Sequence, residues 1–296
     1  MNSDAFSNRH PLVNFLFFVG AVGFGVTLMH PAYIAAAAVC ALTYHLLLHG
    51  AKGLRLPLAL LPMLLFMAVL NPLLNTDGGT VLFRIFARPY TLEALVYGAA
   101  AGTAVTVMML WFACYNAVMT GDKFAALFGS RIPSLSLLLT MVLRLIPGMQ
   151  RRTRQITGAR RGIGKGTAAD APAKAKLREG MTVLSTLTDW VLESGVATGD
   201  SMRARGYGSA QRSSFHLCRM TVRDRLLLAV LAVLAAVTLA GALTGGAKAV
   251  YTPAPAFAPR TGFHAASFAA YCAYLLIPVV LHCKEAVQWH ISRSGI

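Results

Sequence analysis

The chain has 296 residues, of which 56% are hydrophobic and only 13% are charged, and its mean hydropathy is +0.59. Since an average globular chain is about one quarter charged, this composition excludes an ordinary soluble domain and indicates an integral membrane protein. The net charge of +16 would suggest nucleic-acid binding in a soluble chain. Here the positive charge is gathered between hydrophobic segments, where the positive-inside bias explains it, so we expect no nucleic-acid partner.

Six apolar segments approach the roughly 20 residues that a helix needs to span the hydrocarbon layer. They are residues 12–28, 32–49, 57–74, 92–119, 226–243 and 265–281. The short link between the first two predicts an antiparallel hairpin, and a Pro-rich loop at 251–259 separates the last two. The fold class predicted is therefore all-α: a polytopic membrane protein of about six transmembrane helices.

The segment 121–225 holds 18 of the 27 Lys and Arg residues. Placing it in the cytoplasm puts both termini there too, with the 75–90 and 251–259 loops outside. The predicted domains are 1–120 with transmembrane helices 1–4, a cytoplasmic domain at 121–225, and 226–296 with helices 5–6.

Two amphipathic helices are predicted inside the basic segment, at 133–156 and about 175–205. The first contains Pro147, which should bend it. The apolar set of the second helix is Val183, Leu184, Leu187, Trp190, Val191 and Val196. Its Gly195 and Gly199 permit close helix approach.

Both helices close with arginine followed by glycine. The first ends in Gly158-Ala-Arg-Arg-Gly162 and the second in Arg203-Ala-Arg-Gly206. One interpretation is a helix C-terminus, with arginine complementing the dipole and the glycine left-handed. The other is docking, because a paired arginine can bind carboxylates or carbonyls of another protein bidentately. The residues alone leave both interpretations open.

The order of elements resembles the transmembrane T component of energy-coupling factor (ECF) transporters, a family that includes the cobalt and nickel permease proteins. The resemblance covers nearly the whole chain. Its most specific match is Met202-Arg-Ala-Arg-Gly-Tyr-Gly208, and the others are His10-Pro-Leu-Val-Asn14, Leu70-Asn-Pro, Gly78-Gly-Thr-Val-Leu82, Thr91-Leu-Glu93, Arg131-Ile-Pro133 and Leu143-Arg-Leu-Ile-Pro147.

This resemblance implies a non-catalytic subunit in the inner, or cell, membrane of a prokaryote. It would couple ATP hydrolysis by two ABC-type ATPase subunits to a small substrate-binding membrane subunit, the S component, for vitamin or metal uptake. Two Ala-Arg-Gly motifs dock the ATPases in that family. Here the second motif corresponds to Ala204, Arg205 and Gly206. The first corresponds to Ala159, Arg160, Arg161 and Gly162, where either arginine could be the anchor. Alignment of the motif on Gly162 favours Arg161, which directly precedes it.

The sequence contains no complete motif for nucleotide or metal binding. In Gly162-Ile-Gly-Lys-Gly-Thr167, Gly166 stands where a phosphate loop needs Ser or Thr directly after the lysine. His45 and His49 have the i, i+4 spacing of metal ligands but no third ligand nearby, and the five cysteines show no C-x-x-C spacing. We therefore expect no cofactor and no bound metal. A self-contained secondary carrier or channel is the alternative function.

Overall fold

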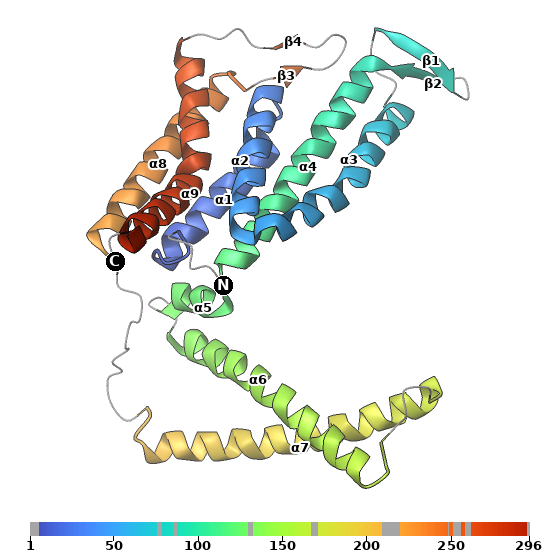
Figure 1. Cartoon of the computed structure of the whole chain (residues 1–296), viewed down its shortest axis with the longest axis vertical. Helices are drawn as coiled ribbons and strands as arrows, with labels where there is room; N and C mark the ends of the chain where they lie inside the picture. Colours follow the sequence, from blue (N-terminus) through green and yellow to red (C-terminus); the bar gives the residue numbers. More distant parts are fainter. Residues whose placement is uncertain are drawn as a thin grey trace. The chain divides into compact units, whose positions relative to one another are not determined.

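The computed structural model describes most of the chain. The residues described are 6–75, 79–85, 88–129, 133–166, 171–208, 220–247, 249–250, 256–257 and 262–294. Within them the chain is almost entirely helical (Figure 1). The helices are α1 (Pro11–Thr27), α2 (Pro31–His49), the 3₁₀ turn η1 (Gly50–Leu54), α3 (Arg55–Leu74), α4 (Leu92–Val118), α5 (Gly121–Gly129), α6 (Pro133–Gly162), α7 (Ala173–Ala204), α8 (Val222–Leu243) and α9 (Gly262–Ser294).

Two short antiparallel strand pairs interrupt the helical pattern. Strand β1 (Val81–Ile85) pairs with β2 (Arg88–Thr91), with Val81 opposite Thr91 and Ile85 opposite Arg88. Strand β3 (Ala249–Val250) pairs with β4 (Ala256–Phe257). The predicted 75–90 loop is therefore partly a β-hairpin. Of the predicted Pro-rich loop at 251–259, all but residues 256–257 lie outside the described part of the chain.

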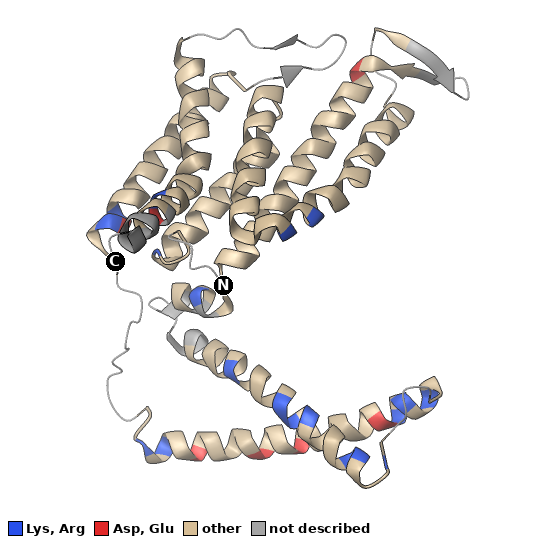
Figure 2. Ribbon diagram, viewed as in Figure 1, with Lys and Arg blue, Asp and Glu red and all other residues tan. Residues whose placement is uncertain are grey.

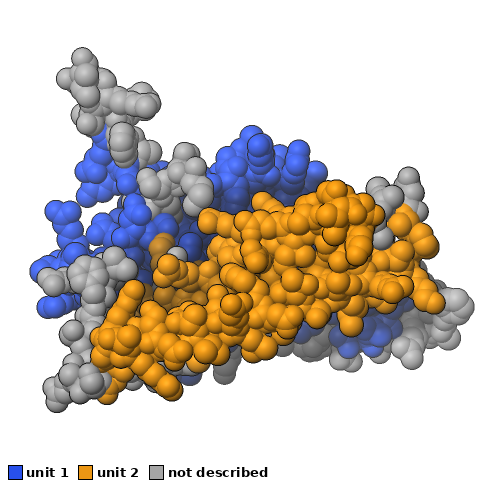
Figure 3. Space-filling view, turned by 90° about the horizontal axis from the view of Figure 1, so that it is seen from below, with its two compact units in different colours: residues 1–120, 218–296 blue, residues 121–217 orange. Residues whose placement is uncertain are grey.

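The chain forms two compact units, coloured separately in Figure 3: unit 1 comprises Met1–Thr120 and Cys218–Ile296, and unit 2 comprises Gly121–Leu217. Charged residues are sparse in the helices of unit 1, whereas unit 2 carries basic residues along α6 and at both ends of α7 (Figure 2). The predicted boundary at residue 225 falls inside α8, which begins at Val222.

Among the residues that the structure describes, four helical stretches are long and apolar enough to cross a membrane. They are Pro31–Leu74, Leu92–Val118, Val222–Leu243 and Gly262–Glu285. The first of these is 44 residues long and includes both α2 and α3, while α1, with 17 residues, is shorter than the roughly 20 residues that span the hydrocarbon layer. The protein is therefore a helical protein with several membrane-spanning segments.

The starts of the apolar helices follow from local chemistry. α1 and α2 each begin at a proline preceded by a histidine: His10 Nδ1 accepts a hydrogen bond from the Leu12 backbone N–H, and His30 Nδ1 accepts one from Ala32, each at 3.2 Å. Proline suits the first helical position because its missing N–H needs no partner there. α8 begins four residues before the prediction because Thr221 and Asp224 form a capping box.

The core of unit 1 is an aromatic cluster shared by α1, α2, α4 and α9. Its fully buried members include Phe17, Phe18, Tyr44, Trp111 and Tyr274. The rings of Phe17 and Tyr274 stack at a centroid separation of 5.3 Å, and the Tyr274 hydroxyl donates to the Phe17 carbonyl at 2.9 Å. The polar tip of this buried tyrosine is thus satisfied, as burial requires.

α3 packs against α4 through small residues. A Cβ added to Gly98 would lie 2.7 Å from Cβ of Asn71 and 3.0 Å from the Met67 carbonyl, and one added to Gly102 would lie 3.0 Å from the Leu64 carbonyl. The two glycines are one turn apart and let the helix backbones approach closely. The rest of α3 presents exposed apolar side chains, such as Leu65 and Phe66, as a lipid-facing helix does.

Unit 2 contains α5 and the two long helices α6 and α7. Both long helices have one face of apolar residues, but α6 continues to Gly162, six residues beyond the predicted end, and passes through Pro147 without ending. α7 matches the predicted range within two residues at each end. α5 was not expected from the sequence.

Candidate functional site

The end of α7 is a Schellman motif centred on the second arginine-glycine pair. The Gly206 N–H donates to the Arg203 carbonyl at 2.9 Å, and the Tyr207 N–H donates to the Met202 carbonyl at 3.0 Å. Gly206 has a φ of +76°, a conformation that costs a residue with a Cβ about 1–2 kcal/mol. The predicted role of Gly206 as the left-handed residue after the helix is therefore confirmed.

The end of α6 has the same pair of bonds, but two residues later than the sequence predicted. The Gly164 N–H donates to the Arg161 carbonyl at 3.1 Å, the Lys165 N–H donates to the Arg160 carbonyl at 2.9 Å, and Gly164 has a φ of +69°. Gly162 lies inside α6. The expectation that Gly162 is left-handed is wrong, because Gly162 is still the last residue of the helix and Gly164, which has no Cβ, takes the left-handed conformation instead.

The two helix ends are therefore alike in geometry but offset in sequence. Arg161 and Arg203 occupy the same position, three residues before the left-handed glycine, and each of their carbonyls accepts that glycine's N–H. Arg205, by contrast, is the residue directly before Gly206, and the residue equivalent to it in the first motif is Ile163. Matching the motifs by sequence pairs Arg161 with Arg205, whereas matching them by cap geometry pairs Arg161 with Arg203.

Arg160 and Arg161 differ in their surroundings. The Arg160 side chain is 24% exposed and its Nε lies 4.0 Å from a carboxylate oxygen of Glu179 on α7, so it helps to join the two helices. Arg161 is exposed, and no carboxylate in the described part of the chain forms an ion pair with it. Of the two candidate anchors in the first motif, Arg161 is thus the arginine that can reach a partner without breaking a contact between α6 and α7.

The remaining predicted site residues are all accessible. Ala159, Gly162, Ala204, Arg205 and Gly206 are exposed. Each helix end therefore presents an arginine side chain beside a turn. A guanidinium in this setting can donate two parallel hydrogen bonds to a carboxylate or to backbone carbonyls of another protein.

α6 and α7 contact each other away from their ends as well. The Arg152 guanidinium lies 5.9 Å from the ring centroid of Trp190, and a Cβ on Gly148 would lie 3.7 Å from the same ring. Val183 and Leu187 are buried. Because Arg152 meets Trp190 while Arg160 meets Glu179, the two helices run antiparallel where they touch.

Part of the predicted apolar set of α7 is exposed in the described structure. Leu184 is 56% exposed and Val196 is 68% exposed. A Cβ on Gly195 or Gly199 would have nothing within 4 Å, so the close helix approach that these glycines permit is not made by a described part of this chain.

Of the histidine pair at the end of α2, His45 is packed inside unit 1 and His49 is exposed. His45 is buried, its ring centroid lies 4.4 Å from that of His49, and its Nδ1 lies 3.8 Å from Cys114 Sγ. Nδ1 of His49 lies 3.2 Å from the His45 carbonyl oxygen. Among the described residues, no group of three or more His, Cys, Asp or Glu side chains is arranged to hold a metal ion.

Sequence reasoning missed three residues that shape this region: Glu179, Trp190 as a partner of Arg152, and Gly164. A signal for Gly164 was present, because Gly162-Ile-Gly164 offers two glycines that could end the helix. The start of α8 was likewise signalled by Thr221 and Asp224 at the spacing of a capping box. The contacts of Glu179 and Trp190 depend on how the two helices cross.

Comparison with models of protein families gave no match for this chain, and a search of curated proteins gave none either.

Proposed function

We propose that this protein is the membrane-embedded coupling subunit of an ATP-driven importer. In this role it links ATP hydrolysis by two ABC-type ATPase subunits to a small substrate-binding membrane subunit. The chain itself is non-catalytic, and the nucleotide chemistry belongs to the partners. The proposal follows the resemblance to the T component of ECF transporters, and the cargo would be a vitamin or a metal ion.

The architecture of unit 1 supports six membrane spans. The 44-residue stretch Pro31–Leu74 divides at η1, which contains Lys52 and is followed by Arg55, into two helices of 19 and 20 residues. α1 is 17 residues long, and the next residue, Leu28, extends the apolar segment without adding a charge. With α4, α8 and α9 this gives six spans, with the basic unit 2 between the fourth and the fifth on the cytoplasmic side.

The character of the buried polar groups supports a coupling role over a self-contained carrier. The Thr238 hydroxyl donates to the Leu234 carbonyl, and the Ser267 hydroxyl donates to the Thr238 carbonyl. The carboxylate of Glu93, in the first turn of α4, accepts hydrogen bonds from the backbone and side chain of Thr80. These polar groups are used in packing and capping, whereas a carrier needs polar groups that face a binding site near the midplane.

The observation that carries the proposal is the pair of helix ends in unit 2. α6 and α7 each close in a Schellman turn that presents an exposed arginine, Arg161 in the first and Arg205 in the second. One exposed arginine at each of two helix ends on one unit suits two copies of one partner. Arg160 remains the alternative anchor at the first end, at the cost of its contact with Glu179.

The proposal is tested by tagging the full chain in its native host and purifying it in mild detergent. We expect two ABC-type ATPase subunits for each copy of the chain, a small membrane protein in the same complex, and ATP hydrolysis that is lost when the ATPases are removed. Recovery of the chain without ATPases, or ATP hydrolysis by the chain alone, would reject the proposal.

A further inference from the structure

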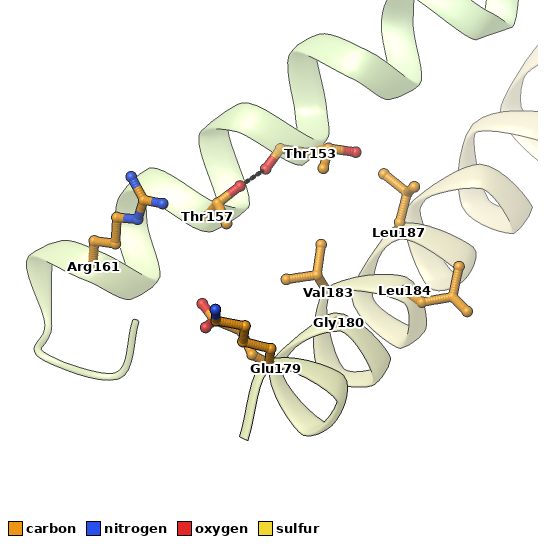
Figure 4. Close-up of a pocket in the computed structure, with 9 residues that line it drawn as sticks. Thr153, Thr157, Arg161, Glu179, Gly180, Val183, Leu184 and Leu187 are labelled. Atoms are coloured by element: carbon orange, nitrogen blue, oxygen red, sulfur yellow. Dashed lines mark hydrogen bonds between the residues drawn. The ribbon is translucent and has the colours of Figure 1, made fainter. Parts of the chain in front are cut away.

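α6 covers one face of α7 and leaves another face exposed. Val183 and Leu187 are buried on the covered face, where they line an open groove of about 450 Å³ between the two helices (Figure 4). Leu184 lies at the rim of this groove and is 56% exposed. The residues that line the groove from α6 are Thr153, Thr157 and Arg161.

The exposed face of α7 carries a stripe of mostly apolar and small residues. Each member follows the one before by three or four residues, a spacing that places side chains in one line along a helix. The members are Leu177, Met181, Leu184, Thr188, Leu192, Gly195 and Gly199. All seven are exposed, and the four large apolar members are 56% to 70% exposed. An exposed apolar surface of this extent is typical of a protein interface.

The shape of the stripe is complementary to itself when two copies lie antiparallel. With Thr188 opposite Thr188 of the second copy, each large residue of the first half meets a member of the second half. Leu177 then faces Gly199, and Met181 faces Gly195. A Cβ on either glycine would meet nothing within 4 Å, so both glycines leave room for a large side chain of the second copy. An in-register parallel pair would instead place glycine against glycine and leave gaps.

The charges along α7 favour the same antiparallel arrangement. Residues 173–188 include three basic residues and one acidic residue, whereas residues 189–204 include three acidic residues and one basic residue. An antiparallel pair brings each half beside the half of opposite charge, and charges that flank an apolar seam set the orientation of paired helices. Arg178 and Asp200 are exposed and directly follow Leu177 and Gly199, so they flank the same part of the interface.

We propose that the stripe from Leu177 to Gly199 pairs two copies of this chain through antiparallel α7 helices. A two-fold axis passes beside Thr188, so that every contact is made twice, as in other symmetric dimers. A second copy fits this surface because it supplies both the large side chains that the glycines accommodate and the opposite charges. This pairing concerns the chain without ATPases and does not depend on the coupling role.

The orientation is tested by cross-linking of the full chain, purified in mild detergent from a background without native cysteines. Chains with Leu177→Cys and chains with Gly199→Cys carry different tags and are mixed before oxidation. We expect a disulfide between the two kinds of chain and little between chains of one kind. In a parallel pair the two positions would be about 33 Å apart, at 1.5 Å per residue, and only chains of one kind would cross-link.

The strength of pairing is measured by light scattering of the purified chain over a dilution series. Gly195→Leu places a branched side chain against Met181 of the second copy, and each dimer contains two such clashes. We expect the dimer dissociation constant to rise about tenfold or more. Gly158→Leu on α6 is the matched control, since Gly158 is exposed, a Cβ there meets nothing within 4 Å and it lies outside the stripe. It should leave the dissociation constant unchanged.

Reversal of charge gives a second test at two exposed positions that do not pack inside unit 2. Arg178→Glu should weaken the dimer, and so should Asp200→Arg, whereas the two changes in one chain should restore it because opposite charges meet again. A monomeric wild type would overturn the proposal and leave the stripe for a helix of another protein. Cross-links confined to chains of one kind, or equal pairing by Gly195→Leu and the wild type, would also overturn it. Arg161 and Arg205 are unchanged throughout.

Discussion

The backbone carbonyls of Arg161 and Arg203 play the same part at the ends of α6 and α7, each accepting a hydrogen bond from the left-handed glycine three residues later. This equivalence means that the sequence motif and the cap geometry give different candidates for the docking arginine at the end of α7. The sequence motif selects Arg205, next to Gly206, whereas cap geometry selects Arg203. Both side chains are exposed, so substitution distinguishes them.

Removing the proposed anchors should disrupt assembly without affecting membrane insertion. Loss of one buried, charge-assisted contact costs roughly 2–5 kcal/mol, so Arg205→Ala should weaken co-purification of the ATPase pair. Arg205→Ala combined with Arg161→Ala should abolish it, since both contacts act through one unit. Arg205→Lys should restore binding only in part because lysine lacks the planar fork. Wild-type recovery of ATPases by the double variant would contradict docking and leave the arginines as caps, worth only about 0.3–1 kcal/mol each.

Arg203→Ala is the matched control for Arg205→Ala, because it removes the same charge from the same helix end. We expect Arg203→Ala to retain most of the bound ATPase at the concentration where Arg205→Ala loses it. Titration of the ATPase against immobilised variants in detergent measures the difference. A larger loss of bound ATPase from Arg203→Ala than from Arg205→Ala would show that Arg203, the residue selected by cap geometry, is the anchor.

The offset between the two helix ends predicts opposite effects at neighbouring glycines. Gly164→Ala forces a Cβ residue into the left-handed region and should destabilise unit 2 by about 1–2 kcal/mol. Gly162→Ala lies within the helix and should be neutral or stabilising by about 0.5–1 kcal/mol. Thermal unfolding of the purified chain, followed by a fluorophore on unit 2, should show a lower midpoint for Gly164→Ala only. A lower unfolding midpoint for Gly162→Ala than for Gly164→Ala would show that Gly162 is the left-handed residue at the end of α6.

Close packing of α3 on α4 makes Gly98 intolerant of any side chain. Gly98→Ala places a methyl 2.7 Å from Asn71 Cβ and 3.0 Å from the Met67 carbonyl, and overpacking of this kind costs typically about 1–3 kcal/mol. Gly23→Ala on α1 is the control, since its Cβ would meet nothing within 4 Å. Thermal stability in detergent should fall for Gly98→Ala and not for Gly23→Ala. Equal stability of the two variants would show that α3 is not packed on Gly98.

The charge distribution predicts that unit 2 and both termini face the cytoplasm. In a background without native cysteines, a single cysteine at Thr252 should react with a membrane-impermeant reagent added to intact cells, and one at Ser213 should react only after lysis. Strong labelling at Ser213 in intact cells would overturn this orientation.

The sequence by itself determined the membrane-spanning character of the chain and the positions of most of its helices, although it predicted neither α5 nor the extension of α9 to Ser294. The hydropathy of a segment and the spacing of its apolar residues are local properties of the sequence. The predicted segment 32–49 and the observed α2 (Pro31–His49) therefore differ by only one residue. The same holds for 92–119 and α4 (Leu92–Val118). Gly206 was also identified correctly, because a glycine after a periodic segment is a local signal for a helix end.

The tertiary structure decided what depends on which residues meet across helices. The sequence left Arg160 and Arg161 as alternatives, and only the antiparallel crossing of α6 and α7 places Glu179 beside Arg160 and leaves Arg161 exposed. The structure likewise placed the left-handed turn at Gly164 rather than Gly162. It also buried Val183 and Leu187 of α7 and opened a groove next to them, because side chains far apart in the chain become neighbours only when the helices pack.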